Sequence, residues 1–458
     1  MKPDQQSWER REKAAFFHTF TDLPTIHEDG ATVIERGEGI YVFDTAGRRY
    51  LEGNAGLWNM TLGFSEKRLA EAARRQYDAL PGYHTFFARN TKPAIELAER
   101  VRALSPMPMG RVFFTNSGSE SNESVIKLLW MIWASEGQPK RRKLITRKNA
   151  YHGATVMTAN LTGKDYVRAF GPPSPEVIMA DCPHAWRYAL PDESDEAFSA
   201  RLAASLERTI EAEGPETIAG FFAEPIMGAG GVLIPPKGYF PAIQKVLKKY
   251  AIPLVSDEVI CGFGRSGEVW GAETVGMVPD IMVASKSISA GYFPMGAVML
   301  SKSIDERLSA ACEPWAEFPL GFTTAGHPVG CAISLEAIRI ILDGGVFEHL
   351  RAVSPHFMAR LKALGTHPLV GEARGVGLMG ALEMVADKAS KASLPGPVRI
   401  GERLAHTARD RGLIIRPLGG ALVIAPPFII TAGQIDELFD TLQGVLDTVH
   451  GEIRRDEA

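Results

Sequence analysis

The sequence predicts an α/β protein with a mostly parallel sheet and a smaller α+β segment. Apolar runs typical of strands alternate with helical patterns between residues 110 and 300, as in a parallel sheet covered on both faces. The run over residues 281–284 is continuously apolar, which is typical of a strand buried on both faces. The length of 458 residues exceeds what one small core can organise and suggests two domains, or a large domain with a smaller one.

The first part of the chain is predicted to form an arm, a hairpin and a helix. Residues 37–51 alternate between apolar and polar side chains around a turn at residues 44–47, which indicates a β-hairpin. Residues 56–59 place an aromatic side chain in a glycine-bearing loop. A helix is expected from residue 65 to about residue 80.

The middle of the chain supplies the predicted strands of the large sheet. A strand at residues 111–115 breaks at residues 116–120, and an amphipathic helix follows to about residue 136. Further elements are expected at these positions: strands at residues 143–146, 217–223, 252–257 and 281–284, and a helix at residues 239–250.

The last part of the chain is predicted to be helical at first and then mixed. After residues 326–328 the pattern is helical to about residue 345 and again to about residue 365. Strands are expected at residues 381–385, 413–416 and 421–425, and helices at residues 399–411 and 431–450. The last helix opens on Thr431 and Gln434 in a capping-box pattern. No internal repeat is visible.

Composition and charge exclude several classes of protein. The chain is 45% hydrophobic and 23% charged, as in an ordinary globular protein, and its net charge of −4 gives no reason to expect nucleic acid or a membrane surface as a partner. The four cysteines are far apart, which predicts reduced thiols in the cytoplasm. No apolar run reaches the roughly 18 residues of a membrane helix, and the polar N-terminus does not resemble a signal peptide.

Some familiar motifs are present only by spacing. Two stretches match G-x-G-x-x-G, at residues 262–267 and 375–380, but neither opens a helix, so both are predicted to be turns. The chain has no G-x-x-x-x-G-K-[ST] motif, which excludes a P-loop NTPase. H-E-x-x-H is absent and the histidines are scattered, so no metal site is expected.

A set of polar side chains at predicted strand ends shares one purpose. Lys286 and Asp257 each follow a buried strand, and the carboxyl ends of parallel strands meet at the crevice where such sheets bind ligands. Residues 117–119 (Ser117, Gly118 and Ser119) place a hydroxyl-bearing turn at a helix start, which suits an anion such as phosphate. Tyr151 and His152 offer ring faces for stacking.

Each of these features has an ordinary explanation when taken alone. Most lysines at strand ends are solvated, and Ser and Asn are the commonest helix N-caps. Together, however, an amine, a carboxylate, an anion seat and an aromatic plate are the groups that hold pyridoxal phosphate. In that combination the lysine is the group that can form a Schiff base with a carbonyl.

With these residues in place, the sequence resembles the class-III (ω-type) aminotransferases of the fold-type-I pyridoxal-phosphate superfamily over nearly its whole length. The motifs that carry the resemblance lie at residues 114–120, 151–153, 224–231, 256–265, 286, 291–292, 321–323 and 326–328. The resemblance implies a large domain with a mostly parallel seven-stranded sheet, and a smaller α+β domain built from the N-terminal arm and the C-terminal part. It further implies a homodimer with active sites built across the interface, and it leaves open whether dimers assemble into tetramers.

The predicted domain boundaries follow from this comparison. Residues 1–64 form the N-terminal arm and part of the small domain, residues 65–326 form the large cofactor-binding domain, and residues 327–458 form a connecting helix and the C-terminal small domain.

The resemblance also implies roles for individual residues. Lys286 is the Schiff-base and proton-shuttling residue, and Asp257 pairs with the ring nitrogen of the cofactor. The other residues implied to hold the cofactor are Ser117, Gly118, Ser119, Tyr151, His152, Glu224 and Val259, with Phe322 and Thr323 contributed by the neighbouring subunit.

Amine or ω-amino acid:pyruvate transaminases are the most similar subgroup, and they imply a substrate pocket. Its residues are Phe20, Leu57, Trp58, Phe86 (from the partner chain), Ile260 and Arg416. Arg416 ends a predicted strand, where it is either a solvated arginine or the group that grips the carboxylate of the acceptor. Trp58 is either part of a core or a wall of the pocket.

Two departures from the family pattern lie near the expected substrate side. Asn59 follows Trp58 where relatives often carry a small or thiol residue, and Thr324-Ala325 replaces a common Tyr-Ser pair. They leave the physiological donor and the stereochemical preference open.

Two other functions fit the same scaffold. One is a pyridoxal-phosphate-dependent aminomutase or lyase, which the cofactor residues do not separate from a transaminase. The other is a non-catalytic protein on a decayed enzyme scaffold, against which the presence of both Lys286 and Asp257 argues. The sequence therefore predicts a cytoplasmic transaminase with small-molecule substrates, an amine donor and a 2-oxo acid acceptor.

Overall fold

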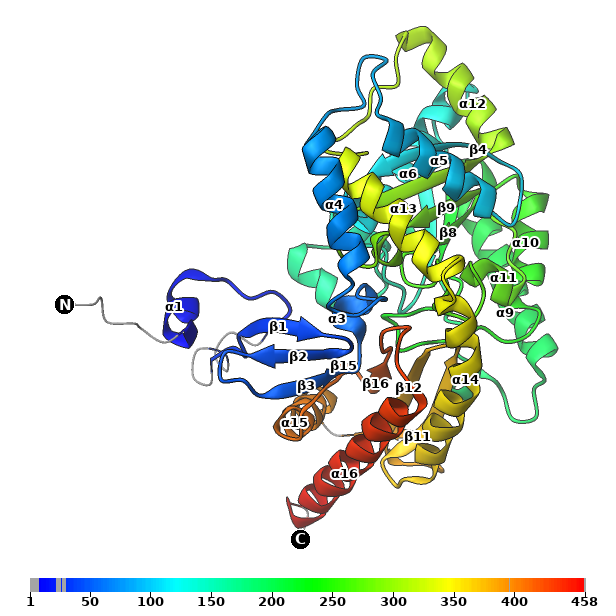
Figure 1. Ribbon diagram of the computed structural model, residues 1–458. Coiled ribbons are helices and arrows are strands. Elements are labelled where there is room, and N and C mark those ends of the chain that lie inside the picture. The colour runs from blue at the N-terminus through cyan, green and yellow to red at the C-terminus, as the bar shows by residue number, and fades with distance from the viewer. Residues whose placement is uncertain (1–7, 22–25, 27–29, 395, 457–458) are drawn as a thin grey trace.

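The computed structural model describes residues 8–21, 26, 30–394 and 396–456. A seven-stranded sheet forms the centre of the larger part of the molecule, in the upper half of Figure 1. In spatial order its strands are β4 (Met109–Thr115), β10 (Gly296–Ser301), β9 (Ile281–Ala284), β8 (Leu254–Asp257), β7 (Ile218–Ala223), β5 (Lys143–Arg147) and β6 (Val177–Ala180). β10 is antiparallel to both of its neighbours, whereas β6, β5, β7, β8 and β9 pair in parallel. The predicted mostly parallel sheet is confirmed.

Helices cover both faces of this sheet because its strands present apolar side chains to each side. In β9, Ile281 and Val283 pack with α6 (Gly118–Ser135) and α12 (Lys302–Cys312) in one cluster. Met282 and Ala284 pack with the helices of the other face, which are α5 (Lys92–Leu104), α9 (Asp195–Glu213), α10 (Tyr239–Lys249) and α13 (Pro328–Leu342). This alternation is the physical basis of the continuous apolar run in the sequence.

Two smaller sheets lie below the large one in Figure 1. One contains β1 (Ile34–Glu38), β2 (Tyr41–Asp44), β3 (Arg49–Glu52) and β14 (Leu413–Ile414), and the predicted hairpin is its β2–β3 pair. The other contains β11 (Val370–Val376), β12 (Met379–Asp387), β16 (Ala421–Ile424) and β15 (Arg416–Leu418), with β13 (Ala392–Ser393) paired to β12. Both sheets contribute side chains to one shared apolar cluster.

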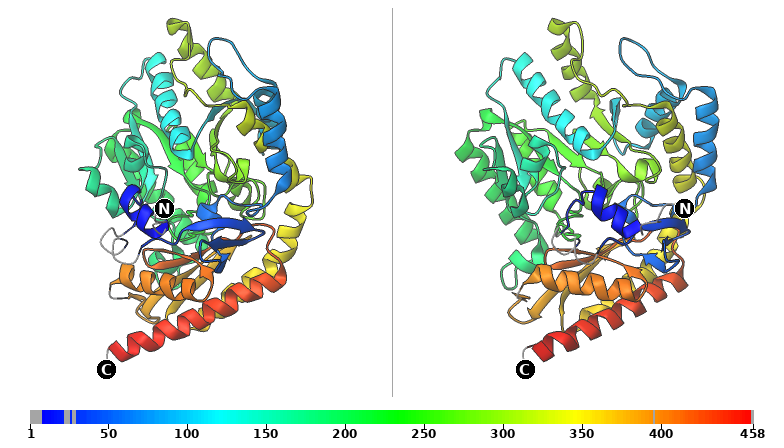
Figure 2. Two further views of the ribbon diagram at one scale, coloured as in Figure 1. Left: turned by 60° about the vertical axis from the view of Figure 1, so that its left-hand side comes forward. Right: turned by 90° about the vertical axis from the view of Figure 1, so that its left-hand side faces the viewer.

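Three helices pack against these smaller sheets: α14 (Val346–Ala363), α15 (Pro397–Asp410) and α16 (Ala432–Asp456). α16 runs along the lower edge of both views in Figure 2. The predicted capping box is confirmed, since the Gln434 side chain accepts from Thr431 N (3.0 Å) and the Thr431 hydroxyl accepts from Gln434 N (3.3 Å). None of the helices in the described ranges is both long enough and apolar enough to cross a bilayer.

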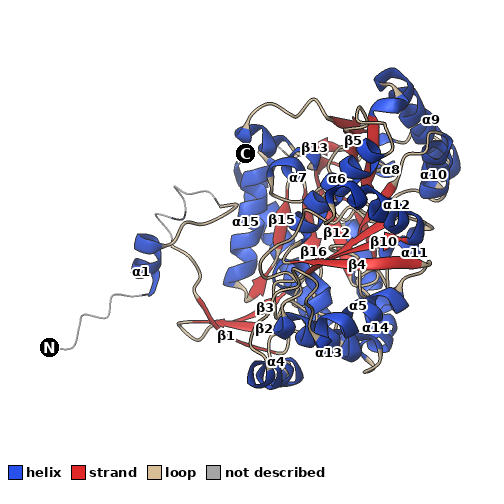
Figure 3. Cartoon of the chain, turned by 90° about the horizontal axis from the view of Figure 1, so that it is seen from above, coloured by secondary structure: helices blue, strands red, loops and turns tan. Residues whose placement is uncertain are grey.

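The remaining helices are short or peripheral. They are α1 (Trp8–Ala15), α3 (Ala55–Trp58), α4 (Lys67–Ala79), α7 (Val156–Leu161), α8 (Ala185–Tyr188) and α11 (Gly271–Val275), with 3₁₀ turns at Asp165–Phe170, Pro215–Thr217, Lys286–Ser289, Glu313–Trp315 and Leu364–Thr366. α1 stands away from the rest of the molecule in Figures 1 and 3. Neither G-x-G-x-x-G stretch opens a helix. Residues 262–267 lie in the turns after β8, as expected, whereas only Gly377 and Leu378 of the second stretch form a turn, between β11 and β12.

The predicted strand at residues 413–416 is wrong as a single element. The chain splits at Ile415 into β14, which pairs in parallel with β3, and β15, which pairs antiparallel with β16. Because the two halves satisfy their backbone hydrogen bonds in different sheets, the segment links the two sheets.

Candidate active site

Lys286 and Asp257 lie at the ends of neighbouring strands and share a cavity. β8 ends at Asp257 and pairs in parallel with β9, which ends two residues before Lys286. The cavity has a volume of about 220 Å³. Its walls are formed by Ser117, Gly118, Ser119, Tyr151, His152, Gly153, Glu224, Asp257, Val259, Ile260, Ser285 and Lys286. The structure thus brings together the predicted amine, carboxylate, anion seat and aromatic plate.

The carboxylate of Asp257 is held by three donors. Its Oδ2 atom accepts from Asn122 Nδ2 (2.7 Å) and lies 2.8 Å from His152 Nδ1, and its Oδ1 atom accepts from the Val259 backbone N–H (3.1 Å). Asp257, Asn122 and His152 are all buried. These three contacts fix the orientation of the carboxylate. Asn122 was not predicted: its signal, a polar residue one turn into the helix that opens at Gly118, is visible only once α6 is placed beside β8.

The Lys286 amine is set apart from ordinary lysines. Burial lowers its pKa to about 8, while the negative charges of Asp257 and Glu224 act in the opposite direction. Its backbone adopts φ 48°, in the left-handed region that non-glycine residues rarely occupy. Such strain is characteristic of residues whose side chain is aimed at a functional site.

The predicted anion seat is the N-terminus of α6, which begins at Gly118. Ser117 is the N-cap, and its hydroxyl accepts from Glu120 N (3.1 Å). A Cβ atom at Gly118 would lie 2.6 Å from Cγ2 of Val259, so only glycine allows this close approach. The Ser119 hydroxyl accepts from Ala154 N (3.1 Å), which ties the helix start to the loop after Tyr151. The helix dipole favours an anion at this end.

Glu224 supports the aromatic loop. Its carboxylate accepts from Tyr151 N (3.1 Å) and from Gly228 N (2.9 Å), and burial raises its pKa. Tyr151 is half-buried in the cavity wall, and burial raises the pKa of its hydroxyl as well. The loop is therefore anchored by a carboxylate that does not have to point at a ligand itself.

Arg416 lies beside this cavity without lining it. Its positive charge lowers the pKa of Lys286, and it acts on the hydroxyls of Tyr151 and Tyr166 in the same way. Burial lowers the pKa of the half-buried Arg416 itself. Within the described part of the chain no carboxylate pairs with its guanidinium, whereas the buried arginines there donate to a carbonyl or a carboxylate. Phe20 packs edge-to-face on Tyr166 at 5.4 Å between ring centroids, which brings the N-terminal arm to the same side.

The predicted pocket residues on the other side differ in exposure. Trp58 is 1% exposed and packs with Ile260, a residue of the cavity wall, whereas Leu57 is 59% exposed. Both alternatives for Trp58 therefore describe part of what is seen, because it belongs to an apolar cluster that borders the cavity.

The three residues that the resemblance assigns to the partner's site do not line the cavity of their own chain. Phe86 packs on Gly321, where an added Cβ atom would lie 2.6 Å from the Phe86 ring. The ring centroids of Phe322 and Phe113 lie 6.4 Å apart, and Thr323 is exposed. The structure places Phe86, Phe322 and Thr323 in one surface region.

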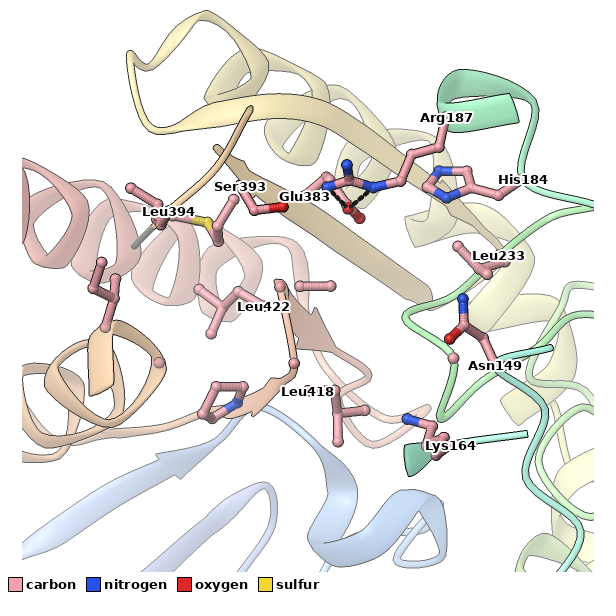
Figure 4. Close-up of a pocket in the computed structure, with 18 of the residues that line it drawn as sticks. Asn149, Lys164, His184, Arg187, Leu233, Glu383, Ser393, Leu394, Leu418 and Leu422 are labelled. Carbon is pink, nitrogen blue, oxygen red and sulfur yellow. Dashed lines mark hydrogen bonds and ion pairs between the residues drawn. The ribbon is translucent and has the colours of Figure 1, made fainter. Parts of the chain in front are cut away.

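A second, larger cavity of about 410 Å³ lies between the large sheet region and the smaller sheets (Figure 4). It is lined by Lys164, Leu233, Leu418 and Leu422 among others, and by the ion pair in which Arg187 Nε donates to Glu383 at 2.7 Å. It contains neither Lys286 nor Asp257, so the smaller cavity is the candidate active site despite its size.

Comparisons with known proteins agree with this site. The family model described as "Aminotransferase class-III" matches residues 25–446. A probable γ-aminobutyrate transaminase 3, mitochondrial, from Oryza sativa subsp. indica is 43% identical over 408 residues, which cover 89% of this chain and 80% of the relative.

Solved structures are similar over almost the whole chain. The pyridoxamine-phosphate-bound (PMP-bound) aminotransferase from Vibrio fluvialis is 51% identical, with a TM-score of 0.96 over 98% of this chain and 99% of that one. An ω-aminotransferase from Paracoccus denitrificans is 51% identical, with a TM-score of 0.96 over 98% of this chain and 100% of that one. The chain belongs to the class-III aminotransferases, the pyridoxal-phosphate enzymes of fold type I.

Proposed function

We propose that this aminotransferase moves an amino group from an amine or ω-amino acid donor to pyruvate or a similar 2-oxo acid. The observation that carries the proposal is Arg416, a half-buried guanidinium beside the Lys286 cavity with no carboxylate partner in the described part of the chain. A guanidinium can bind a carboxylate through two parallel hydrogen bonds, which suits the acceptor. The names of the relatives support the donor class: γ-aminobutyrate is an ω-amino acid, and the Paracoccus protein is an ω-aminotransferase.

The residues of the cavity fit pyridoxal phosphate by their chemistry. The α6 N-terminus with Gly118 and Ser119, which line the cavity, would take the phosphate, because backbone N–H groups and the helix dipole at a helix start favour an anion. Asp257 would face the ring nitrogen, and Tyr151 and Val259 would lie against the ring. When bound, the cofactor supplies an electron sink for the electrons released at the substrate carbon.

The protein's own groups then have distinct tasks. The Lys286 amine, with a pKa of about 8, can take up and return a proton near neutral pH. Asp257, with Asn122 and His152 fixing it, holds a proton at the ring nitrogen. Arg416 orients the acceptor by its carboxylate. Trp58, Leu57 and Ile260 form apolar surface for the donor.

A donor panel tests the proposal most directly. With pyruvate as acceptor, alanine should form in equal amount to the aldehyde or ketone made from the donor, both for γ-aminobutyrate and for an uncharged benzylic amine. An aminomutase or a lyase would consume the donor without forming alanine. The Arg416→Met variant should lose roughly 100-fold in kcat/KM for pyruvate, since a charge-assisted pair of hydrogen bonds contributes about 3 kcal/mol. An unchanged value would contradict the assignment of Arg416.

A homodimer with shared active sites is also proposed. Large apolar side chains are strongly exposed in one chain, among them Phe17 (76%), Phe87 (79%), Val156 (79%) and Phe170 (80%). Exposed apolar surface of this kind supports an interface. The surface region of Phe86, Phe322 and Thr323 would then reach the partner's cavity. A cytoplasmic location is proposed as well, and the four free cysteines support it.

A further inference from the structure

The segment from Glu52 to Asn59, called here the 52–59 turn, joins two parts of the proposed substrate pocket. It begins at the end of β3 and contains Leu57 and Trp58. Three of its residues have left-handed backbone conformations: Ala55 (φ 45°), Gly56 (φ 63°) and Trp58 (φ 69°). Such conformations persist only where the surroundings impose them.

Two polar side chains impose the shape of the turn from within. The buried Glu52 carboxylate accepts from Asn54 N (2.9 Å) and from the backbone N–H of Gly56. The Asn59 Oδ1 atom accepts from Leu57 N at 2.9 Å. The turn also packs on the loop after Lys286, because a Cβ atom at Gly291 would lie 2.8 Å from Asn59 Nδ2. The wall residues Leu57 and Trp58 are therefore held by side chains that do not face the cavity.

Asn54 connects the turn to Arg416. With its amide oriented to satisfy both neighbours, Asn54 Oδ1 accepts from the backbone N–H of Arg416 (2.7 Å) and Nδ2 donates to the carbonyl of Val423 (2.9 Å). Arg416 and Val423 are register partners at the end of the β15–β16 pair. Asn54 is 2% exposed, so water cannot replace these bonds.

Backbone hydrogen bonds reinforce the same connection. Gly53 N donates to the carbonyl of Ile414 (2.9 Å), and Ala425 N donates to the carbonyl of Gly53 (2.7 Å). The start of the turn is thus bound on one side to the strand before Arg416 and on the other to the strand that pairs with it.

We propose that Asn54 is a positioning residue that couples the aromatic wall of the substrate pocket to the carboxylate-binding arginine. It holds Arg416 and the 52–59 turn in one arrangement, so that the space left for the bulky group of an amine and the position of the acceptor carboxylate are set together. This inference rests on the proposed function, since it assumes that Arg416 binds the acceptor and that Trp58 borders the donor.

The test compares alanine substitutions of two asparagines within the same turn. Asn54→Ala should raise the KM for pyruvate and the inhibition constant of propionate, a carboxylate without the reacting keto group, by roughly ten-fold, as expected when the backbone N–H of Arg416 loses its buried acceptor. It should also reduce the discrimination between small and bulky uncharged amines. Asn59→Ala, which removes a contact of Leu57 but none of Arg416, should change the amine discrimination and leave propionate inhibition as it is. Gln443→Ala on α16 serves as a control for amide deletion at an exposed site.

Each result has a defined meaning. The proposal is overturned if Asn54→Ala leaves propionate inhibition unchanged, or if it lowers kcat equally for all substrates together with the melting temperature, as a merely structural residue would. Arg416→Met separates this failure from that of the proposed function. If Arg416→Met weakens propionate inhibition and Asn54→Ala does not, only the coupling is wrong. If neither variant affects it, the assignment of Arg416 fails as well.

Discussion

At the scale of single residues, the Lys286 amine is the group whose chemistry differs most from its free form. Burial removes water from the ammonium and lowers its pKa to about 8, and the charges of Asp257 and Glu224 oppose this shift only in part. At a pH of about 8 a lysine with an ordinary pKa is almost wholly protonated, whereas about half of the Lys286 amine is neutral and nucleophilic.

This predicts the pH dependence of Lys286 labelling in the cofactor-free enzyme. The rate of acylation by an amine-directed reagent should rise as the pH increases through about 8 and then level off, because only the neutral amine reacts. Mass spectrometry of the Lys286 peptide measures it, and exposed lysines in the same digest, which titrate near ~10.4, provide the reference. Asp257→Asn should move the midpoint to lower pH, because it removes a negative charge that favours the ammonium form of Lys286 in the unmodified enzyme. A Lys286 profile that follows the exposed lysines would contradict the assignment.

The sequence was informative for residues that belong to motifs and silent for their supports. Lys286, Asp257 and the serines around Gly118 follow strand ends, and position within a strand–turn–helix unit is a local property. Asn122 and Asn54 have no such signal. Each acts on a residue far away in the chain, Asp257 and Arg416 respectively, and the contact exists only after α6 and β15 have been placed. Supports of this kind require the tertiary structure.

At the scale of elements, the start of α6 determines how closely a ligand can approach the helix N-terminus. Gly118→Ala adds a Cβ atom that would lie 2.6 Å from Cγ2 of Val259 and 3.0 Å from Cγ1. Either Val259 or the helix start must move, at a cost of about 1–3 kcal/mol for an overpacked site. The dissociation constant of pyridoxal phosphate, measured by fluorescence titration, should rise at least roughly ten-fold.

A second substitution distinguishes crowding from a general loss of stability. In Gly118→Ala combined with Val259→Ala the added methyl group has room. Because Val259→Ala alone also removes a side chain proposed to lie against the ring, the Gly118→Ala change should cost less cofactor affinity in the Val259→Ala background than in the unmodified enzyme. Equal affinities for Gly118→Ala and the unmodified enzyme would show that the close approach has no role in binding.

The elements that the sequence missed have two different explanations. α9 could have been found, because Ser194 is an N-cap whose hydroxyl accepts from Ala197 N (3.2 Å) and acidic residues fill the first turn. β10 begins at Gly296 just after Pro294, which locally indicates a loop, and its antiparallel pairing with β4 and β9 is decided by the sheet. The break at Ile415 also depends on the tertiary structure, because the residues before it pair with one sheet and the residues after it pair with another.

At the scale of the whole molecule, the predicted division at residue 327 remains a prediction. α13 begins at Pro328 and contributes to two apolar clusters: Cys331 and Ile338 pack with the large sheet, whereas Ile333 and Ala337 pack with the smaller sheets. A helix with two apolar faces packs against both parts of the molecule. Sequence periodicity alone does not reveal this, because the two faces together appear as one hydrophobic segment.

The arrangement of residues around Thr323 leads to a prediction about the assembly. Thr324 donates its hydroxyl to Asn116 Oδ1 (3.0 Å) beside the α6 start, yet Thr323 is exposed and does not line the cavity of its own chain. If Thr323 serves the partner's phosphate seat, Thr323→Asp should abolish activity by placing a negative charge next to the phosphate. Lys286→Ala should abolish it as well.

Subunits that carry one substitution each should then restore activity when they are mixed. In a mixed dimer one site contains both defects and the other contains neither, so the purified mixed dimer should show roughly half of the unmodified activity. Co-expression with two affinity tags, followed by assay of the doubly purified dimer, measures this. No recovery would mean that Thr323 acts within its own chain, because each mixed site would then carry a defect. Full activity of Thr323→Asp alone would remove Thr323 from the site altogether.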